Sequence, residues 1–291
     1  MKYYLKSVFF LMSCLCAHTG WADESPKSFS HFELGAEVIS YSETTTVAGH
    51  EVNMSQHVVN PVQYTLGYTP LDDDAGFYIQ VATTLDAISV NESWDIAPFG
   101  EVQTNQRKVR WNDLTLLYAS KFEYSGFQLV GGLNMMTLSF MRSNFQKSTG
   151  APAFEASIAP TTYAVFPGSI TEDSTNLSAM IGVRYNTVFS DAYDDGRFLF
   201  SLLGGMPLYY KVENSNFPDT TWVEYFQGYD VQSNIGYAFR IYEDFFLSMN
   251  VNASFKQRPE TSRVAVSGGM GRIPEVLMYN VRTTVGLEWG F

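Results

Sequence analysis

Long segments of strict two-residue alternation are the feature of this sequence that most restricts its fold. Residues 32–38 (FELGAEV), 229–241 (YDVQSNIGYAFRI) and 245–256 (FFLSMNVNASFK) each alternate apolar side chains with polar or small ones. Successive side chains of a β-strand point to opposite faces, so each segment has one apolar face and one face rich in Asn, Ser and Gly. The pattern predicts an all-β protein built from long, amphipathic strands.

Strand length and composition favour a transmembrane barrel over a soluble barrel or sandwich, which would show the same alternation with its apolar face inward. The segments run to 12 residues or more, whereas soluble strands average about five or six, and a tilted membrane strand needs about 9–11. Aromatic residues make up 15% of the chain and charged residues only 16%, against a usual charged share of about 25%. An outer surface that meets lipid explains this balance.

Four short connections rich in Asp and Gly divide the strands: 70–76, 122–126, 191–196 and 242–244. Asp and Gly suit tight turns, and each connection is followed by an aromatic start such as Phe77 or Phe127, as expected of an aromatic girdle. We therefore predict an antiparallel up-and-down barrel of ten strands with short periplasmic turns and long extracellular loops; twelve strands is the alternative if 141–174 holds another hairpin. The predicted strands are 30–41, 59–69, 76–88, 109–121, 126–140, 175–188, 196–211, 225–241, 245–256 and 276–291.

The amino terminus reads as a secretory signal peptide over residues 1–22. Lys2 and Lys6 precede a short apolar stretch, and Gly20-Trp21-Ala22 is a small-x-small site for cleavage after Ala22. A lipobox ending at Cys14 is the disfavoured alternative. Cleavage removes both cysteines, so residues 23–291, the predicted single barrel domain, contain no thiol. With 16 basic and 30 acidic residues left, the net charge is −14 and nucleic acid is excluded as a partner.

The last eight residues, 284–291 (TVGLEWGF), resemble the β-signal of Gram-negative outer-membrane β-barrel proteins. Thr284, Gly286, Trp289 and Phe291 occupy the polar, glycine, aromatic and terminal-aromatic positions of that motif. The resemblance implies a bacterial outer-membrane location and recognition of the last strand by the barrel insertion machinery. Outer-membrane lipid and lipopolysaccharide would then surround the barrel.

Strand parity places a set of charged side chains inside the predicted barrel. An Arg on the lipid face at mid-depth would cost about 2–4 kcal/mol, which agrees with an inward orientation. Closing the barrel sets the first strand beside the last and brings Glu37 to the height of Arg282. The set either fills a narrow lumen as an ion-paired network or lines a polar path for solutes. It comprises Glu33, Glu37, Asp86, Arg110, Arg184, Arg197, Asp230, Arg240, Lys256, Arg282 and Glu288.

The third predicted surface loop, within 141–174, is weakly charged and aromatic. Residues 148–171 contain one charged side chain, Glu155, together with Phe154, Tyr163 and Phe166. Long loops are usually functional or disordered, and disorder normally accompanies low hydrophobicity. The loop is therefore expected at the barrel mouth as a lid, as extra strands, or as a partner-binding surface.

Catalytic and metal-binding patterns are weak. The chain lacks G-x-S-x-G and H-E-x-x-H motifs. The best catalytic pair that can be assembled is His57 with Asp86, at the outer ends of neighbouring predicted strands. A surface metal site from His50, His57 and nearby Glu residues has no spacing that compels coordination. We therefore expect no cofactor, no metal and no enzyme activity.

Three functions remain from the sequence. The leading one is a narrow porin-like channel for small polar solutes, with the charged lumen lining the path and segment 141–174 at its mouth. The alternative is a non-conducting surface barrel whose loops serve adhesion or ligand binding. An outer-membrane hydrolase is a distant third.

Overall fold

The computed structural model describes residues 28–71, 74–122, 126–161, 163–187, 196–264 and 270–290. The predicted signal peptide, residues 1–22, and the terminal Phe291 lie outside these residues, so the cleavage site and the last position of the β-signal remain predictions. Among the described residues, no helix is long and apolar enough to cross a membrane.

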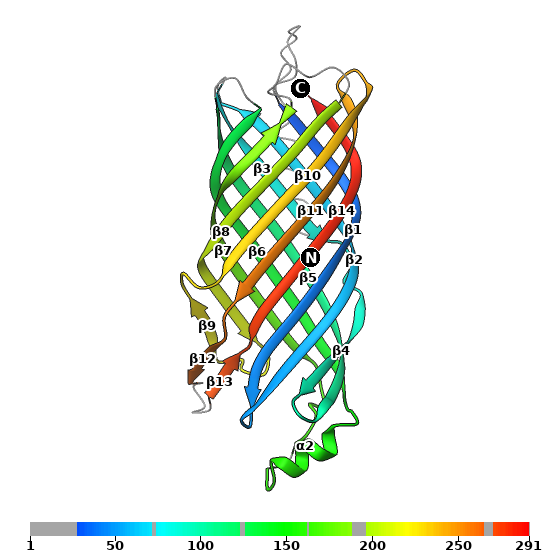
Figure 1. Ribbon diagram of the computed structural model, residues 1–291, viewed down its shortest axis with the longest axis vertical. Coiled ribbons are helices and arrows are strands. Elements are labelled where there is room, and N and C mark those ends of the chain that lie inside the picture. The colour runs from blue at the N-terminus through cyan, green and yellow to red at the C-terminus, as the bar shows by residue number, and fades with distance from the viewer. Residues whose placement is uncertain are drawn as a thin grey trace.

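The described strands close into an antiparallel up-and-down barrel of ten strands, as predicted (Figure 1). One of the ten is interrupted, so that β3 and β4 together form a single wall strand between β2 and β5. The ring order is β1 (Phe29–Val47), β2 (His50–Pro70), β3 (Ala75–Thr84) with β4 (Ser89–Ile96), β5 (Gly100–Lys121), β6 (Phe127–Lys147), β7 (Ile170–Asn186), β8 (Gly196–Asn214), β10 (Tyr229–Tyr242), β11 (Phe245–Arg258) and β14 (Glu275–Gly290).

Short strands and a helix lie at the end of the barrel opposite the short turns (Figure 1). Strand β9 (Thr221–Glu224) pairs with the outer end of β8, and β12 (Thr261–Val264) pairs with β13 (Met270–Ile273). A single described helix, α2 (Ala151–Ser157), follows β6. The described part of segment 141–174 thus adds no strand to the ring, and the twelve-stranded alternative is not found there.

Each wall strand buries every second side chain inside the barrel, as the alternation predicted. On β5, Trp111 and Leu117 are buried, whereas Leu114, Leu116 and Tyr118 face outward and are more than two-fifths exposed. Outward aromatic side chains gather near the short turns, where the Phe77 and Tyr118 ring centroids are 5.7 Å apart and those of Phe127 and Tyr185 4.8 Å. The predicted aromatic girdle is therefore present at this end.

The strands continue well beyond the apolar outer band, which the sequence did not predict. On β1 the outward side chains change from Phe32, Leu34 and Val38 to Ser and Thr after residue 40. Strands β1 and β2 nevertheless stay paired as far as Val47 and His50 and join at a tight turn in which Gly49 has a φ of 84°. The predicted loop 42–58 is a strand hairpin, because alternation persists while its outer face becomes polar.

The barrel closes between β1 and β14 in the predicted register. Glu37 and Arg282 are direct cross-strand partners. The two backbones approach closely here: a Cβ added to Gly286 would lie 2.0 Å from the carbonyl oxygen of Phe32, and one added to Gly35 would lie 1.9 Å from that of Thr283. A side chain at Gly286 would push the closing strands apart, and this explains why the predicted β-signal has a glycine at that position.

Candidate functional site

Most of the charged residues assigned to the lumen lie inside the barrel. Arg240 is on the inward side of β10 but exposed at the rim, with its guanidinium 5.6 Å from the Phe246 ring centroid. Whether the set lines a conducting path stays a prediction. The buried members are Glu33, Glu37, Arg184, Arg197, Asp230, Lys256, Arg282 and Glu288.

Two members of the predicted lumen set are placed differently. Arg110 is exposed on the outer face of β5, between the inward-facing Val109 and Trp111. It lies beyond Leu114, the last apolar outward residue of this strand, so the cost of placing Arg against hydrocarbon does not apply. Asp86 is exposed in the break between β3 and β4, where strand parity no longer holds. The inward orientation predicted for both residues was wrong.

A hydrogen-bonded cluster around Glu37 crosses the middle of the barrel. Glu37, fully buried on β1, accepts hydrogen bonds from Trp111 Nε1 at 2.6 Å, Thr84 Oγ1 at 2.8 Å and Asn280 Nδ2 at 3.0 Å. Trp111 comes from β5, three positions round the ring. A buried carboxylate needs such donors, because an unsatisfied buried charge is strongly destabilising.

Lys256 forms a second crossing at the same general depth. Its ammonium Nζ lies 2.6 Å from Asp230 Oδ2, 3.6 Å from Asp113 Oδ2 and 3.3 Å from Asn134 Oδ1. Lys256 is on β11 and Asn134 on β6, so three ring strands, β10, β8 and β7, separate them along the shorter path round the barrel. One side chain therefore ties nearly opposite walls of the barrel together.

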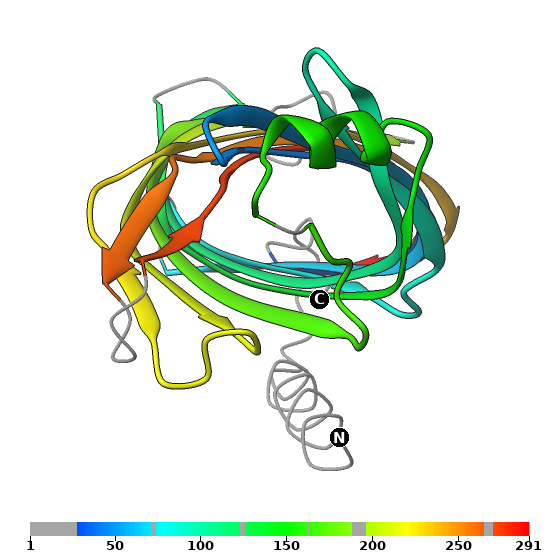
Figure 2. The same ribbon diagram turned by 90° about the horizontal axis from the view of Figure 1, so that it is seen from below.

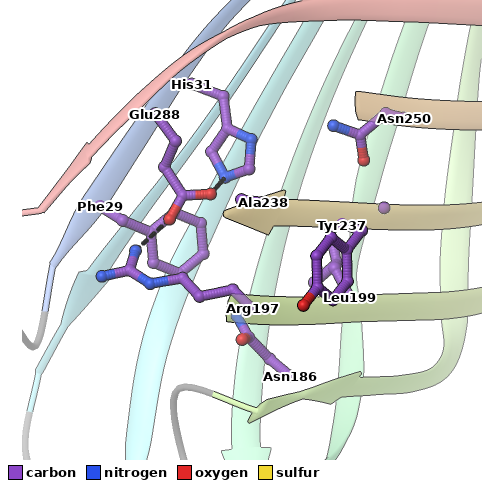
Figure 3. Close-up of a pocket in the computed structure, with 10 residues that line it drawn as sticks. Phe29, His31, Asn186, Arg197, Leu199, Tyr237, Ala238, Asn250 and Glu288 are labelled. Carbon is purple, nitrogen blue, oxygen red and sulfur yellow. Dashed lines mark hydrogen bonds and ion pairs between the residues drawn. The ribbon is translucent and has the colours of Figure 1, made fainter. Parts of the chain in front are cut away.

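The end of the barrel with the short turns holds a third cluster (Figure 3). His31 Nε2 lies 2.7 Å from Glu288 Oε2, and Arg197 forms an ion pair with the same carboxylate from across the barrel. His31 Nδ1 is 3.4 Å from Glu33 Oε1. The cavity beside this cluster measures about 10 Å³, so it holds at most one water molecule. His31 carried no predicted role, although its parity with Glu33 would have placed it inward.

The extracellular part of the barrel contains a buried ion cluster that the sequence reading missed. Glu92 accepts from Arg107 Nη1 at 2.7 Å and from Arg142 Nε at 2.6 Å, and Arg142 Nη2 lies 2.8 Å from Glu43 Oε1. All four side chains are buried. Two-residue alternation could have found part of it. Glu43 shares the inward face of its strand with Glu37, and Arg107 shares the inward face of its strand with Trp111.

This cluster lies beyond the apolar band, and its charges set the acidity of the two carboxyl groups. Burial alone would raise the pKa of Glu92, but the charges of Arg142 and Arg107 outweigh burial and lower that pKa to about 2. The same balance of burial against Arg142 and Arg107 leaves the pKa of Glu43 below its usual range. Both carboxyl groups are therefore ionised at neutral pH and bound to guanidinium groups.

The mouth segment, which is the described part of residues 141–174, packs against one side of the barrel rim opposite the short turns (Figure 2). Phe154 of α2 is fully buried in a small apolar core with Val52, Met54, Ile96 and Val102. This core fixes α2 to the outer ends of β2, β4 and β5. The segment has its own packing site, as its weak charge and aromatic content predicted.

The other two aromatic residues of the mouth segment differ from Phe154. The Tyr163 hydroxyl donates a hydrogen bond to Gln103 Oε1 at 2.7 Å, and burial raises the pKa of this hydroxyl to about 12. Phe166 remains 41% exposed and packs edge-to-face with Phe145, with ring centroids 5.9 Å apart. Phe154 and Tyr163 thus anchor the segment, while Phe166 stays accessible.

The catalytic and metal arrangements considered from the sequence do not assemble. His57 and Asp86 are both exposed, and the described structure records no hydrogen bond or ion pair between them. Within the described ranges, no group of three or more His, Cys, Asp or Glu side chains is arranged to hold a metal ion. His50 instead packs its ring edge-on against Phe99 and Phe154.

Comparisons with known proteins identify the fold. No protein-family model matches the sequence, and no curated protein matches it. The outer membrane protease OmpT from Escherichia coli is similar in structure, with a TM-score of 0.68 and 12% identity, over 94% of this chain and 100% of that chain. The outer membrane protein OprG from Pseudomonas aeruginosa matches at a TM-score of 0.36 and 11% identity, over 91% and 97% of the two chains.

The attachment invasion locus protein Ail of Yersinia pestis also matches, at a TM-score of 0.33 and 9% identity, over 90% of this chain and 99% of that chain. The likeness to OmpT, at 12% identity, shows the fold alone. The chain has the fold of the outer-membrane β-barrel proteins of Gram-negative bacteria.

Proposed function

We propose that this protein is a non-conducting outer-membrane barrel that presents its extended extracellular strands as a binding surface. The observation that carries the proposal is that side chains bridge the bore at three heights. Arg142 meets Glu43 and Glu92 at the extracellular end, Lys256 meets Asp113 and Asp230 in the middle, and Arg197 meets Glu288 at the periplasmic end.

The size of three interior cavities supports a closed bore. They measure about 10, 30 and 20 Å³, enough for isolated water molecules and too little for a hydrated solute. A small ten-stranded barrel filled with side chains behaves as a packed core. This arrangement favours the surface-barrel alternative over the porin-like channel that led from the sequence.

The extracellular extension supports the binding role. Strands β1 and β2 keep their pairing beyond the apolar band, and the small core around Phe154 fixes the rim on the β2–β5 side. Binding to a rigid, preorganised surface avoids the entropy cost of ordering loops. OmpT, which is similar in structure, is a protease, but His50 and His57, the histidines of the extracellular end, have no hydrogen bond or ion pair to a carboxylate among the described residues.

Planar-bilayer recording of the refolded chain tests the closed bore. We expect no single-channel steps from the wild-type protein or from Lys256→Ala alone, and we expect steps when Arg142→Ala, Lys256→Ala and Arg197→Ala are combined, which removes one crossing at each of the three heights. Arg110→Ala, on the outer face, is the matched control and should stay silent. Regular steps from the wild type would overturn the proposal and restore the channel reading.

A labelling experiment tests the orientation on which the binding surface depends. The only two cysteines are Cys14 and Cys16, in the predicted signal peptide, so Gly49→Cys adds a single reporter at the tip of the β1–β2 hairpin. A membrane-impermeant maleimide should label this variant on intact cells, whereas Leu71→Cys, at an exposed position of a short turn, should be labelled only after lysis. The reverse pattern would contradict the orientation.

A further inference from the structure

Two buried arginines, Arg184 and Arg282, differ from the other interior arginines because no carboxylate oxygen lies within 4.0 Å of them among the described residues. Arg107, Arg142, Arg197 and Arg258 each lie within 4.0 Å of a carboxylate oxygen. Nε and Nη1 of Arg282, and the same atoms of Arg184, are buried without a hydrogen-bond partner among the described residues. A buried charged donor without an acceptor is costly, so these atoms indicate a place where an acceptor binds.

The cross-strand neighbour Glu37 offsets part of the charge of Arg282, but no hydrogen bond joins the two side chains among the described residues. The oxygens of Glu37 accept instead from Thr84, Trp111 and Asn280. The guanidinium of Arg282 instead lies between two aromatic rings, 5.0 Å from the Trp111 centroid and 5.3 Å from that of Tyr64. The rings hold the cation in place and leave its N–H groups facing the cavity that these residues line.

The other polar groups of this cavity are also oriented as donors. Asn252 accepts from Asn234 through Oδ1, so its Nδ2 is the free end, and Nδ2 has no partner. Gln80 accepts from Arg184 through Oε1, which leaves its amide N–H₂ as a donor. The cavity therefore brings a guanidinium and two amide donors to one small space from β14, β11 and β3.

One acidic residue, Asp113, lines the same cavity. It accepts from Asn134 at 2.9 Å and from Thr115 at 3.1 Å, and Lys256, which also pairs with Asp230, lies 3.6 Å away. The buried side-chain atoms of the cavity that have no partner, on Arg282, Asn252 and Tyr64, can all donate a hydrogen bond. The cavity measures about 20 Å³, which suits one species the size of a water molecule or a halide ion.

We propose that Arg282, Asn252 and Gln80 form a binding site for one small inorganic anion of chloride size at the middle of the barrel. The anion supplies the acceptor that the unpartnered N–H groups of Arg282 and Asn252 lack, with the Gln80 amide as a further donor. Because side chains bridge the bore on both sides of the site, the anion enters as the barrel folds and exchanges slowly afterwards. The site is independent of the surface-binding role proposed above.

Anomalous diffraction from crystals of the full chain refolded in bromide tests the site directly. We expect one bromide peak within hydrogen-bond distance of Arg282 and Asn252. A peak absent from this cavity, with ordinary solvent density in its place, would overturn the proposal and assign the position to water.

Thermal unfolding in detergent gives a second measurement that needs no crystal. The wild-type midpoint should rise with chloride or bromide concentration until it saturates, relative to sodium gluconate at equal ionic strength, because a ligand of the folded state stabilises it. Arg282→Gln should lose this halide-dependent shift, and the exposed control Arg110→Gln should keep it. Asn252→Leu should weaken the shift if Arg282→Gln does not fold. An equal halide response in wild type, Asn252→Leu and Arg282→Gln would contradict the site.

Discussion

Replacing Glu92 by Gln should destabilise the extracellular half of the barrel more than any comparable exposed change. Glu92 is fully buried and accepts charge-assisted hydrogen bonds from Arg107 at 2.7 Å and from Arg142 at 2.6 and 3.0 Å. The isosteric amide keeps the volume but leaves two buried guanidinium groups with only Glu43 as counter-charge. Removing one partner of a buried ion pair costs about 3–5 kcal/mol, and a protein is stable by only about 5–15 kcal/mol in total.

Urea unfolding of the refolded protein in detergent, followed by tryptophan fluorescence, measures this loss. Glu155→Gln is the matched control, because its partner Lys147 is 44% exposed and surface pairs contribute about 0–1 kcal/mol. Combining Glu92→Gln with Arg142→Met should recover part of the loss, since one stranded charge is removed. A Glu92→Gln protein within about 1 kcal/mol of wild type would refute the reasoning.

Three further predictions concern the closing seam, the centre of the barrel and acid. Gly286→Ala should slow folding and lower the yield of heat-modifiable barrel on gels, because its Cβ would meet the Phe32 carbonyl oxygen at 2.0 Å, whereas Gly204→Ala has open space and should fold normally. Trp111→Phe removes the 2.6 Å hydrogen bond to a buried carboxylate and should cost about 1.5–3 kcal/mol in urea unfolding. Because the pKa of Glu92 is lowered from 4.5 to about 2, its stabilisation is complete above pH 4.5 and lost as pH falls toward 2; acid titration of unfolding should show this slope in wild type and a smaller one in Glu92→Gln.

The wall of the barrel could be predicted from the sequence because two-residue alternation states directly which side chains share a face. The strand count, the outward aromatic starts such as Phe77, and the pairing of Glu37 with Arg282 all followed from that pattern. Register was predictable for a physical reason as well. A slip of one residue would turn every inward polar side chain toward lipid.

The interior contacts could not be predicted, because they join strands that are distant in sequence and in ring order. Parity shows that Lys256 points inward, but its contact with Asn134 depends on barrel diameter, tilt and side-chain length. Parity fails where a strand breaks, as at Asp86. At Arg110 the alternation of β5 holds and the side chain points outward, which costs little because the apolar band ends before the strand does. Beyond the apolar band, the outer face of each strand is polar and resembles a loop in composition, although the strand backbones remain paired.

The last strand illustrates how one short segment meets two requirements. Its resemblance to the β-signal concerns recognition during insertion, but in the folded barrel the same residues form the seam. Gly286 permits the close approach to β1, Thr284 donates a hydrogen bond to Glu33, and Glu288 joins His31 to Arg197 across the barrel. Glu288 occupies a position that the motif leaves open, so a change there such as Glu288→Gln separates the two requirements. It should leave delivery to the outer membrane unchanged while weakening the closed barrel, which heat-modifiability and urea unfolding of the membrane-extracted protein would measure; loss of delivery instead would show that Glu288 acts during insertion.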